Sequence, residues 1–259
     1  MSELASATWR VLSLWCYPVK SMQGEELDEL TLNADGVTGD RQYGVFDEAS
    51  RTILSAKREG RLFDATATLR DDELTVTLPG GRSYEPGDPL DEGLTQWLGR
   101  PVRLVASSTF GAATYESQSD FERDESSLES WDGPSGSFVD DSPLHLLTTL
   151  DLAQLVNERP ELQWDVRRFR PNVVMEPLVP HPAPFGIGSR VIIGDTEVDV
   201  YKGCTRCVMT TRAQPGALDR ELEILRHVAR HHDSTVGVRA RVVRPGTVRA
   251  GDLVRVRAQ

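Results

Sequence analysis

Short runs of alternating apolar and polar residues fill the first hundred residues of this 259-residue chain. The run WRVLSLWCY (9–17) alternates with a period near two and ends at Pro18, as a strand does on entering a turn. Turn-forming Gly, Pro and Asp residues separate further runs of this kind, namely ELTL, QYGVFD, TILSA, ATATLR, ELTVTLPGG and VRLVAS. This spacing predicts an antiparallel barrel or sandwich across residues 1–106.

The apolar periodicity fades between residues 107 and 137, where Ser, Glu, Asp and Gly accumulate. Such a composition predicts a linker or a long surface loop, with an acidic stretch between residues 119 and 132. A plain surface loop is the expected form. A loop that covered a neighbouring site would control access to that site.

Residues 138–259 combine strand-like and helix-like patterns. The stretch SPLHLLTTLDLAQLVNERP has apolar residues at helical spacing, with Thr149 or Asp151 as N-cap and Pro160 at its end. A second helix is expected within GALDRELEILRHVARHH, and strands are expected in NVVMEP, RVIIGDTEVDVYKG and VGVRARVVRPGTVRAGDLVRVRA. We therefore predict a mainly β protein with a few helices, an α+β fold in which β-rich domains at 1–106 and 138–259 flank the linker.

Charge and composition exclude several classes of function. The formal charge of −11, from 29 basic and 40 acidic residues, repels nucleic acids and anionic lipids over most of the surface. No stretch approaches the ~20 apolar residues that span a bilayer, and residues 1–10 lack the pattern of a secretory signal. The odd number of cysteines, three, indicates reduced thiols. We expect a cytoplasmic protein that binds neither nucleic acid nor membrane.

Two of the cysteines, Cys204 and Cys207, form a C-x-x-C pair at the end of an apolar run. The pair fits half of a zinc site, a thioredoxin-type redox pair, or two buried thiols in a strand. A zinc site needs two more ligands, for which His231 and His232 are candidates, although adjacent residues on a helix point about 100° apart. A thioredoxin-type pair opens a helix, whereas the β-branched run after Cys207 favours a strand. These interpretations stay open at this point.

Two groups of charged residues lie beside predicted element ends. Lys20 and Ser21 follow the first strand and Arg41 precedes another, so that together they suit a phosphate, although each alone is typical of a solvated surface. Asp140 and Asp141 precede a predicted helix, where helix capping competes with an acid–base role.

A third group, Arg167, Arg168 and Arg170, crowds ahead of a strand. A basic cluster in this position is usually solvated or ion-paired. Asn172, which both donates and accepts hydrogen bonds, suits the edge of a heterocycle.

Taken in order, six stretches resemble one family. YPVKS, GDRQYGVFD, SPLHLLT, FRPNVV, CTRCVMTT and VRPGTVRAGDLV are similar to motifs of the MOSC family, the molybdenum cofactor sulfurase C-terminal domain, preceded by its N-terminal β-barrel domain. The resemblance runs from about residue 9 to residue 257. In organisation the chain resembles the amidoxime-reducing molybdenum enzymes of mitochondria and their bacterial counterparts.

This resemblance implies a molybdenum cofactor, molybdopterin with Mo, bound between the two domains. Cys207 corresponds to the protein thiolate on the metal and is our catalytic candidate, whereas Cys204 has no required role. Thiolate is a soft donor that suits molybdenum, and Arg206 helps to keep the sulfur deprotonated. The other cofactor contacts that the resemblance implies are Lys20, Ser21 and Arg41 for the phosphate, and Ser142, Arg170, Asn172 and Arg206 for the pterin.

The implied function is a molybdenum-dependent oxidoreductase that reduces N-hydroxylated or N-oxide compounds. Electrons for a small-molecule substrate are expected from an external protein of flavin, iron–sulfur or haem type, because no cysteine-rich ferredoxin-like stretch occurs in this sequence. Asp140 or Asp141 could relay protons. Two alternatives use the same cysteine, a sulfur carrier with a persulfide on Cys207 and a protein that binds or escorts the cofactor without turnover.

Overall fold

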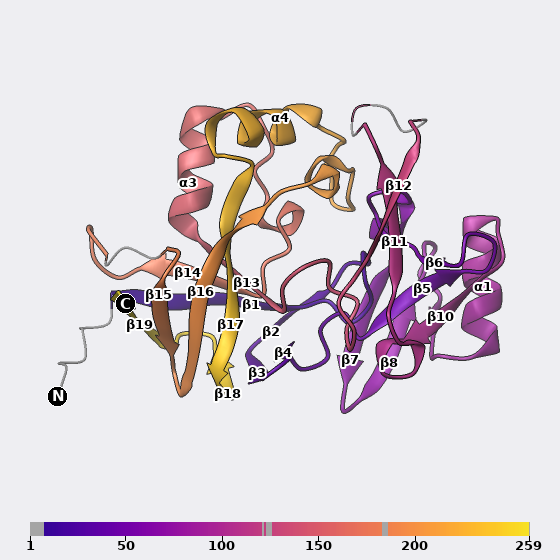
Figure 1. The fold of residues 1–259 in the computed structure, drawn as a ribbon, viewed down its shortest axis with the longest axis horizontal. Helices are drawn as coiled ribbons and strands as arrows, with labels where there is room; N and C mark the ends of the chain where they lie inside the picture. Colours follow the sequence, from indigo (N-terminus) through magenta and orange to yellow (C-terminus); the bar gives the residue numbers. More distant parts are fainter. Residues whose placement is uncertain (1–7, 121, 123–125, 183–185, 259) are drawn as a thin grey trace.

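The computed structural model describes residues 8–120, 122, 126–182 and 186–258, and a closed β-barrel organises one half of the molecule (Figure 1). The barrel order is β14 (Val173–Pro177), β13 (Leu144–Thr148), β17 (Thr235–Arg244), β16 (Thr196–Thr205), β15 (Ser189–Ile193), β19 (Leu253–Ala258) and β1 (Trp9–Cys16). Strand β1 pairs antiparallel with both β19 and β14, which closes the ring, and β2 (Glu25–Leu27) extends from it. Alternate strand residues fill the interior, including Val11, Leu146, Val173 and Val198.

The first strand of the chain therefore belongs to the barrel built mainly by the last third of the sequence. A second link comes from β3 (Glu29–Asn33), which pairs with β18 (Gly246–Arg249) on one side and β4 (Gly36–Val37) on the other. The sequence boundary at residue 106 consequently does not divide the molecule in space, because about thirty residues of the N-terminal segment pack with the barrel.

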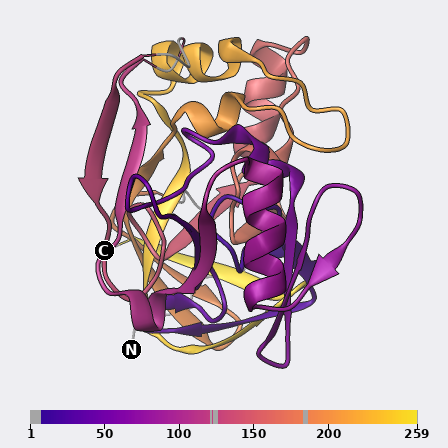
Figure 2. The same cartoon turned by 90° about the vertical axis from the view of Figure 1, so that its right-hand side faces the viewer.

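The other half of the molecule contains two small antiparallel sheets. One has the order β10 (Val102–Ala106), β5 (Tyr43–Asp47), β6 (Thr52–Ile53), and the other β7 (Thr66–Arg70), β8 (Glu73–Thr77), β9 (Ser83–Tyr84). Helix α1 (Asp88–Leu98) covers them at the far end of the molecule (Figures 1 and 2), and η1 (Gly60–Asp64) joins the two sheets. The sequence pattern did not predict α1, although its buried Leu90, Leu94 and Leu98 recur at a spacing of four residues.

Residues 107–137 are more ordered than the expected linker or loop. A four-residue helix α2 (Ser107–Phe110) precedes an antiparallel hairpin of β11 (Thr114–Gln118) and β12 (Leu128–Asp132). Within the predicted acidic stretch, residues 121 and 123–125 lie outside the described residues. The hairpin packs through Tyr115, which is fully buried beside Phe46 and Phe138, so apolar contacts absent from the local sequence pattern hold it in place.

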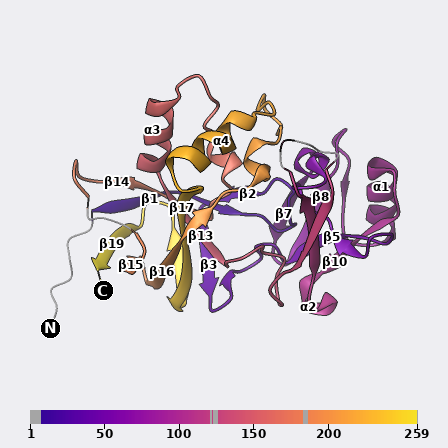
Figure 3. The ribbon, with the colours of Figure 1, turned by 45° about the horizontal axis from the view of Figure 1, so that its top comes forward.

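Two helices lie together at one end of the barrel (Figures 1 and 3). Helix α3 (Thr149–Glu158) begins with a capping box between Thr148 and Asp151, so Thr148 is the N-cap in place of the predicted Thr149 or Asp151. Helix α4 (Leu222–His231) contacts α3 through an apolar cluster that includes Leu155 and Val228.

Short 3₁₀ helices, η2 (Val166–Arg168) and η3 (Val208–Thr211), connect these helices to the barrel strands. The predicted fold class, a mainly β protein of the α+β type with a few helices, is confirmed. Within the part of the chain that the structure describes, no helix is long and apolar enough to cross a membrane.

Candidate functional site

A cavity of about 280 Å³ opens between the barrel and the other half of the molecule. It is strongly cationic, because seven of its lining side chains are lysine or arginine and only two are aspartate. The charged lining residues are Lys20, Arg41, Lys57, Arg168, Arg170, Arg206, Arg239, Asp140 and Asp141. A cavity of this sign in a chain of net charge −11 indicates an anionic ligand.

Asp140 lies between two lysines at this cavity. Lys20 Nζ is 2.5 Å from Asp140 Oδ1 and 2.7 Å from the carbonyl oxygen of Phe138, while Lys57 Nζ is 3.0 Å from Asp140 Oδ2. Burial lowers the pKa of Lys20 to about 8, although Asp140 opposes this shift. Burial also disfavours a charged Asp140, but the two lysines hold the pKa of its carboxyl well below its usual range. Asp140 therefore stays ionised and anchors both ammonium groups, so it is unsuited to the proton relay considered above.

Two guanidinium groups lie over the ring of Tyr17. The central guanidinium carbon of Arg170 is 4.1 Å from the ring centroid and that of Arg41 is 4.7 Å away. Arg41 is ion-paired with Asp40, and burial beside Arg41 lowers the pKa of Arg170 to about 10. The aromatic face and the carboxylate thus hold two mutually repelling cations at the cavity wall.

Ser21, Arg41 and Arg170 share an uncommon backbone conformation, with φ values of 68°, 50° and 52°. Positive φ is disfavoured for residues with a Cβ atom, and such residues cluster at functional sites. Ser21 is fixed further because its Oγ accepts a hydrogen bond from the backbone N–H of Ala56 at 2.9 Å. Packing around the cavity therefore imposes these conformations on residues that the sequence assigned to the site.

The two neighbouring cysteines have different environments. Cys204 is fully buried near the end of β16, where its sulfur accepts a hydrogen bond from Arg206 Nη1 at 2.7 Å. Cys207 is half-buried, lines the cavity and precedes η3. The run after Cys207 is helical, contrary to the expected strand, because the Thr210 hydroxyl donates to the carbonyl of Cys207 and that of Thr211 to the carbonyl of Val208. Cys204 thus positions Arg206, and Cys207 presents a thiol to the cavity.

Cys207 also lines a second cavity, of about 490 Å³, between the β11–β12 hairpin and α4. Its wall includes the apolar side chains of Val208, Leu225 and Ala229, and the indole of Trp131. Arg226 of α4 is ion-paired with Glu122 of the hairpin, at 2.7 Å from Nη2 to Oε1, which ties the two walls together. The two cavities have four lining residues in common, namely Lys57, Trp131, Arg206 and Cys207.

Seven of the eight site residues predicted from the sequence line the first cavity. They are Lys20, Ser21, Arg41, Ser142, Arg170, Arg206 and Cys207. Asn172 does not, because its side-chain amide is used within the barrel, where Oδ1 accepts from the backbone N–H of His145 and Nδ2 donates to the carbonyl of Trp15. The amide of Asn172 thus links β1, β13 and the start of β14, and its predicted contact with a heterocycle stays a prediction.

Sequence reasoning missed Lys57, Trp131, His145 and Arg239, which all line the cavity. One signal existed for Lys57, because the chain has only three lysines. In the structure all three form ion pairs with Asp140 or Asp141. His145 gave no signal because it is a polar residue within an apolar stretch that was expected to be helical and that forms β13. Burial, with Arg206 and Arg239 nearby, keeps its pKa well below the ordinary value, so His145 is neutral at the cavity wall.

Zinc ligation by the cysteines is not supported by the geometry. Among the described residues, the group of His, Cys, Asp and Glu side chains close enough to share a metal ion is Glu158, His227 and His232, without a cysteine. All three cysteines are free thiols, as the composition predicted.

Two family models match this chain. Residues 8–89 match the MOSC N-terminal beta barrel domain, and residues 134–255 match the MOSC domain. The mitochondrial amidoxime reducing component 2 of Bos taurus is 26% identical over 239 residues, covering 82% of this chain and 69% of that protein. The mitochondrial amidoxime-reducing component 1 of Mus musculus is 25% identical over 289 residues, covering 94% and 81%.

Two other relatives extend this picture. The molybdenum cofactor sulfurase of Oryza sativa subsp. japonica is 25% identical over 248 residues, covering 80% of this chain and 29% of that protein. The crystal structure of the YuaD protein from Bacillus subtilis superposes with a TM-score of 0.51 at 13% identity over 97% of both chains, so the two proteins share a fold.

Proposed function

We propose that this chain, which belongs to the MOSC family through its N-terminal beta barrel domain and its MOSC domain, is a molybdenum-cofactor oxidoreductase that reduces N-hydroxylated or N-oxide compounds. The observation that carries the proposal is a buried cationic cavity with the thiol of Cys207 in its wall. Relatives named amidoxime-reducing components support the reaction class.

The residues of the cavity fit an anionic cofactor that accepts hydrogen bonds. Three buried guanidinium nitrogen atoms in its wall have no hydrogen-bond partner among the described residues, namely Arg170 Nη2, Arg206 Nε and Arg239 Nε. An unpaired buried donor costs about 1–3 kcal/mol, so a ligand that pairs with several of them gains correspondingly. Thiolate is also the donor type that molybdenum favours.

Each group at the cavity has a role that its surroundings define. Lys20, Arg41 and Arg170 would bind the phosphate and the pterin, Cys207 would hold the metal, and Arg206 would keep the thiolate charge compensated. When bound, the cofactor supplies a redox-active metal able to remove an oxygen atom from nitrogen. Asp140 prevents repulsion between Lys20 and Lys57 while leaving their remaining N–H groups for the ligand.

The second cavity supports a small-molecule substrate. It meets the first cavity at Cys207, so a molecule bound there would approach the metal from the side of the hairpin. Its apolar wall at Leu225 and Ala229 suits an organic body, and Trp131 offers an aromatic face. We propose that the electrons come from an external flavin, iron–sulfur or haem protein, and that the protein works in the cytoplasm.

One observation also favours the sulfur-carrier alternative. The thiol of Cys207 is half-buried beside two cations, Lys57 and Arg206, an environment that also stabilises a persulfide anion. A carrier would hold sulfur on Cys207 without molybdenum. An escort protein would bind the cofactor but would not turn over a substrate.

Molybdenum analysis of protein from a cofactor-producing host tests the proposal. About one metal per chain is expected in the wild type and in Cys204→Ser, and loss of the metal is expected in Cys207→Ser. Reduction of benzamidoxime by the metal-containing protein with a chemical electron donor should follow the same pattern. Absence of molybdenum from the wild type, together with a persulfide mass on Cys207, would replace the reductase by the carrier.

A further inference from the structure

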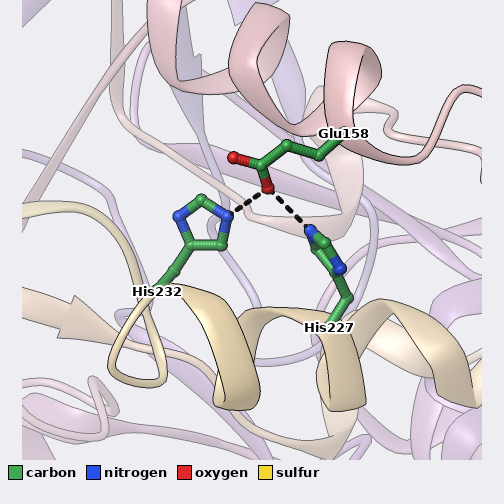
Figure 4. Close-up of side chains that lie close together, drawn as sticks. All are labelled: Glu158, His227 and His232. Carbon is green, nitrogen blue, oxygen red and sulfur yellow. Dashed lines mark hydrogen bonds and ion pairs between the residues drawn. The ribbon is translucent and has the colours of Figure 1, made fainter.

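A second cluster of potential metal ligands lies where the ends of α3 and α4 meet, apart from both cavities at Cys207. Glu158 is the last residue of α3, His227 lies within α4, and His232 follows its end. Figure 4 shows both imidazoles directed at one carboxylate oxygen. Glu158 Oε2 is 2.7 Å from His227 Nε2 and 2.7 Å from His232 Nε2, so three donor atoms converge on one point.

The surroundings hold this arrangement in place. The second carboxylate oxygen, Glu158 Oε1, accepts a hydrogen bond from Gln154 Nε2 at 2.9 Å, which orients the carboxylate and leaves Oε2 to the histidines. His227 is buried against the ring of Trp164, with ring centroids 5.8 Å apart. A hydrogen-bonded carboxylate and an apolar backing are the features that orient metal ligands in proteins.

One side of the cluster remains open. His232 also lines a cavity of about 420 Å³, whose wall includes Thr148, Asp151 and Asp233. Solvent can therefore reach a cation held by the three donors and complete its coordination. Two histidines and one glutamate with an open fourth position are a recognised ligand set for zinc.

We propose that Glu158, His227 and His232 form a binding site for Zn²⁺. Tetrahedral ligation at about 2.0–2.2 Å requires donor atoms roughly 3.3 Å apart, so each present contact of 2.7 Å must open by about 0.6 Å. Each imidazole then carries its proton on Nδ1 and offers the Nε2 lone pair. Small rotations of the Glu158 side chain and of the partly buried His232 side chain supply this movement.

Zinc at this site would fasten α4 to α3. Helix α4 packs on η3, which directly follows Cys207, and carries Leu225 and Ala229 of the second cavity. The ion would thus stiffen one wall of that cavity from outside. The site depends only on its own donors, so zinc binding and molybdenum binding can succeed or fail separately.

Calorimetric titration of the chelator-treated 259-residue chain with Zn²⁺ tests the site. The Cys207→Ser variant is the background, so that this thiol does not compete for the ion. One zinc per chain is expected, together with a rise in melting temperature. His231→Ala is the matched control, because His231 is adjacent in sequence but is not one of the converging donors, and it should bind as the background does.

Loss of one ligand should abolish stoichiometric binding in Glu158→Gln and in His232→Asn, two changes at partly exposed positions that spare the core. Gln154→Ala, which removes the partner of Oε1, should weaken binding about 10-fold or more. A Co²⁺ derivative should show a tetrahedral spectrum without sulfur-to-metal charge transfer. Failure of the background protein to bind zinc, or retention of stoichiometric zinc by both ligand variants, would overturn the proposal and leave a hydrogen-bonded clamp between the helices.

Discussion

Replacing Asp140 by asparagine should destabilise the cofactor-free protein strongly, because Asp140 is the shared counter-charge of two buried lysines. The exposed fraction of the side chain is 6% for Lys20 and 12% for Lys57. Removing one partner of a buried ion pair costs about 3–5 kcal/mol, since the remaining charge is left without compensation. Lys20 limits the loss, because its pKa is already lowered to about 8 and it can release its proton.

We therefore expect a loss of about 3 kcal/mol at pH 7, at the lower end of that range. In a chain of this size each kcal/mol corresponds to roughly 2–4 °C, so the melting temperature should fall by about 6–12 °C. The deficit should shrink at pH 9, where Lys20 is mostly neutral. Adding Lys20→Met to Asp140→Asn should recover part of the loss, because one of the two unpaired cations is then absent.

The assay is thermal and urea unfolding of cofactor-free protein at low salt, followed by circular dichroism. Asp141→Asn is the matched control, since Asp141 pairs with Lys202 at the surface, where the side chains are 48% and 40% exposed. That variant should lose less than about 1 kcal/mol. Equal losses in Asp140→Asn and Asp141→Asn would refute the reasoning, because burial would then not decide the strength of the ion pair.

Three further predictions concern single residues. The folded-state pKa of Lys20, about 8, lies below its ordinary value of 10.5, so the unfolded chain binds more protons than the folded chain between these pH values. The stability of the wild type relative to Lys20→Met should therefore rise by ~3 kcal/mol from pH 8 to pH 10.5, measured by urea unfolding. Thr148→Ala should cost about 1 kcal/mol in unfolding free energy through loss of the α3 cap, and Thr149→Ala, just inside the helix, should cost distinctly less; the reverse order would contradict the assigned N-cap. Asn172→Ala should lower stability by about 1–3 kcal/mol while the folded fraction keeps its molybdenum, and a selective loss of metal would return Asn172 to the cofactor site.

Local patterns predicted many of the strands, because a strand with one buried face repeats every two residues wherever it lies. They missed β13 (Leu144–Thr148), which lies in the stretch that was expected to be helical. The runs at 9–17, 42–47 and 65–70 form β1, β5 and β7 almost as expected. Closure of the barrel could not be predicted in this way, since it depends on β1 pairing with β14 across more than 150 residues of chain. The order of the hairpin at 107–137 was hidden for a similar reason, because Tyr115 is buried by residues distant in sequence.

The site residues also differ in whether local sequence could predict them. Residues in family motifs, such as Lys20, Arg41 and Cys207, were predicted because each motif carries its own local sequence. Lys57 and Arg239 belong to no such motif and reach the cavity only through folding. Asn172 also belongs to a family motif, and in the structure its amide satisfies backbone groups of β1 and β13.

The cationic cavity carries electrostatic and conformational strain that an anion would relieve. Burial lowers the pKa of Lys20 and of Arg170, which means that the fold disfavours their charged forms. Ser21, Arg41 and Arg170 add backbone conformations that cost about 1–3 kcal/mol each in isolation. The packing on both sides of the cavity must supply this free energy. The lysines and arginines of the cavity are already desolvated and oriented, so an anion binds with little further reorganisation. Binding should therefore raise the free energy of unfolding of the whole chain.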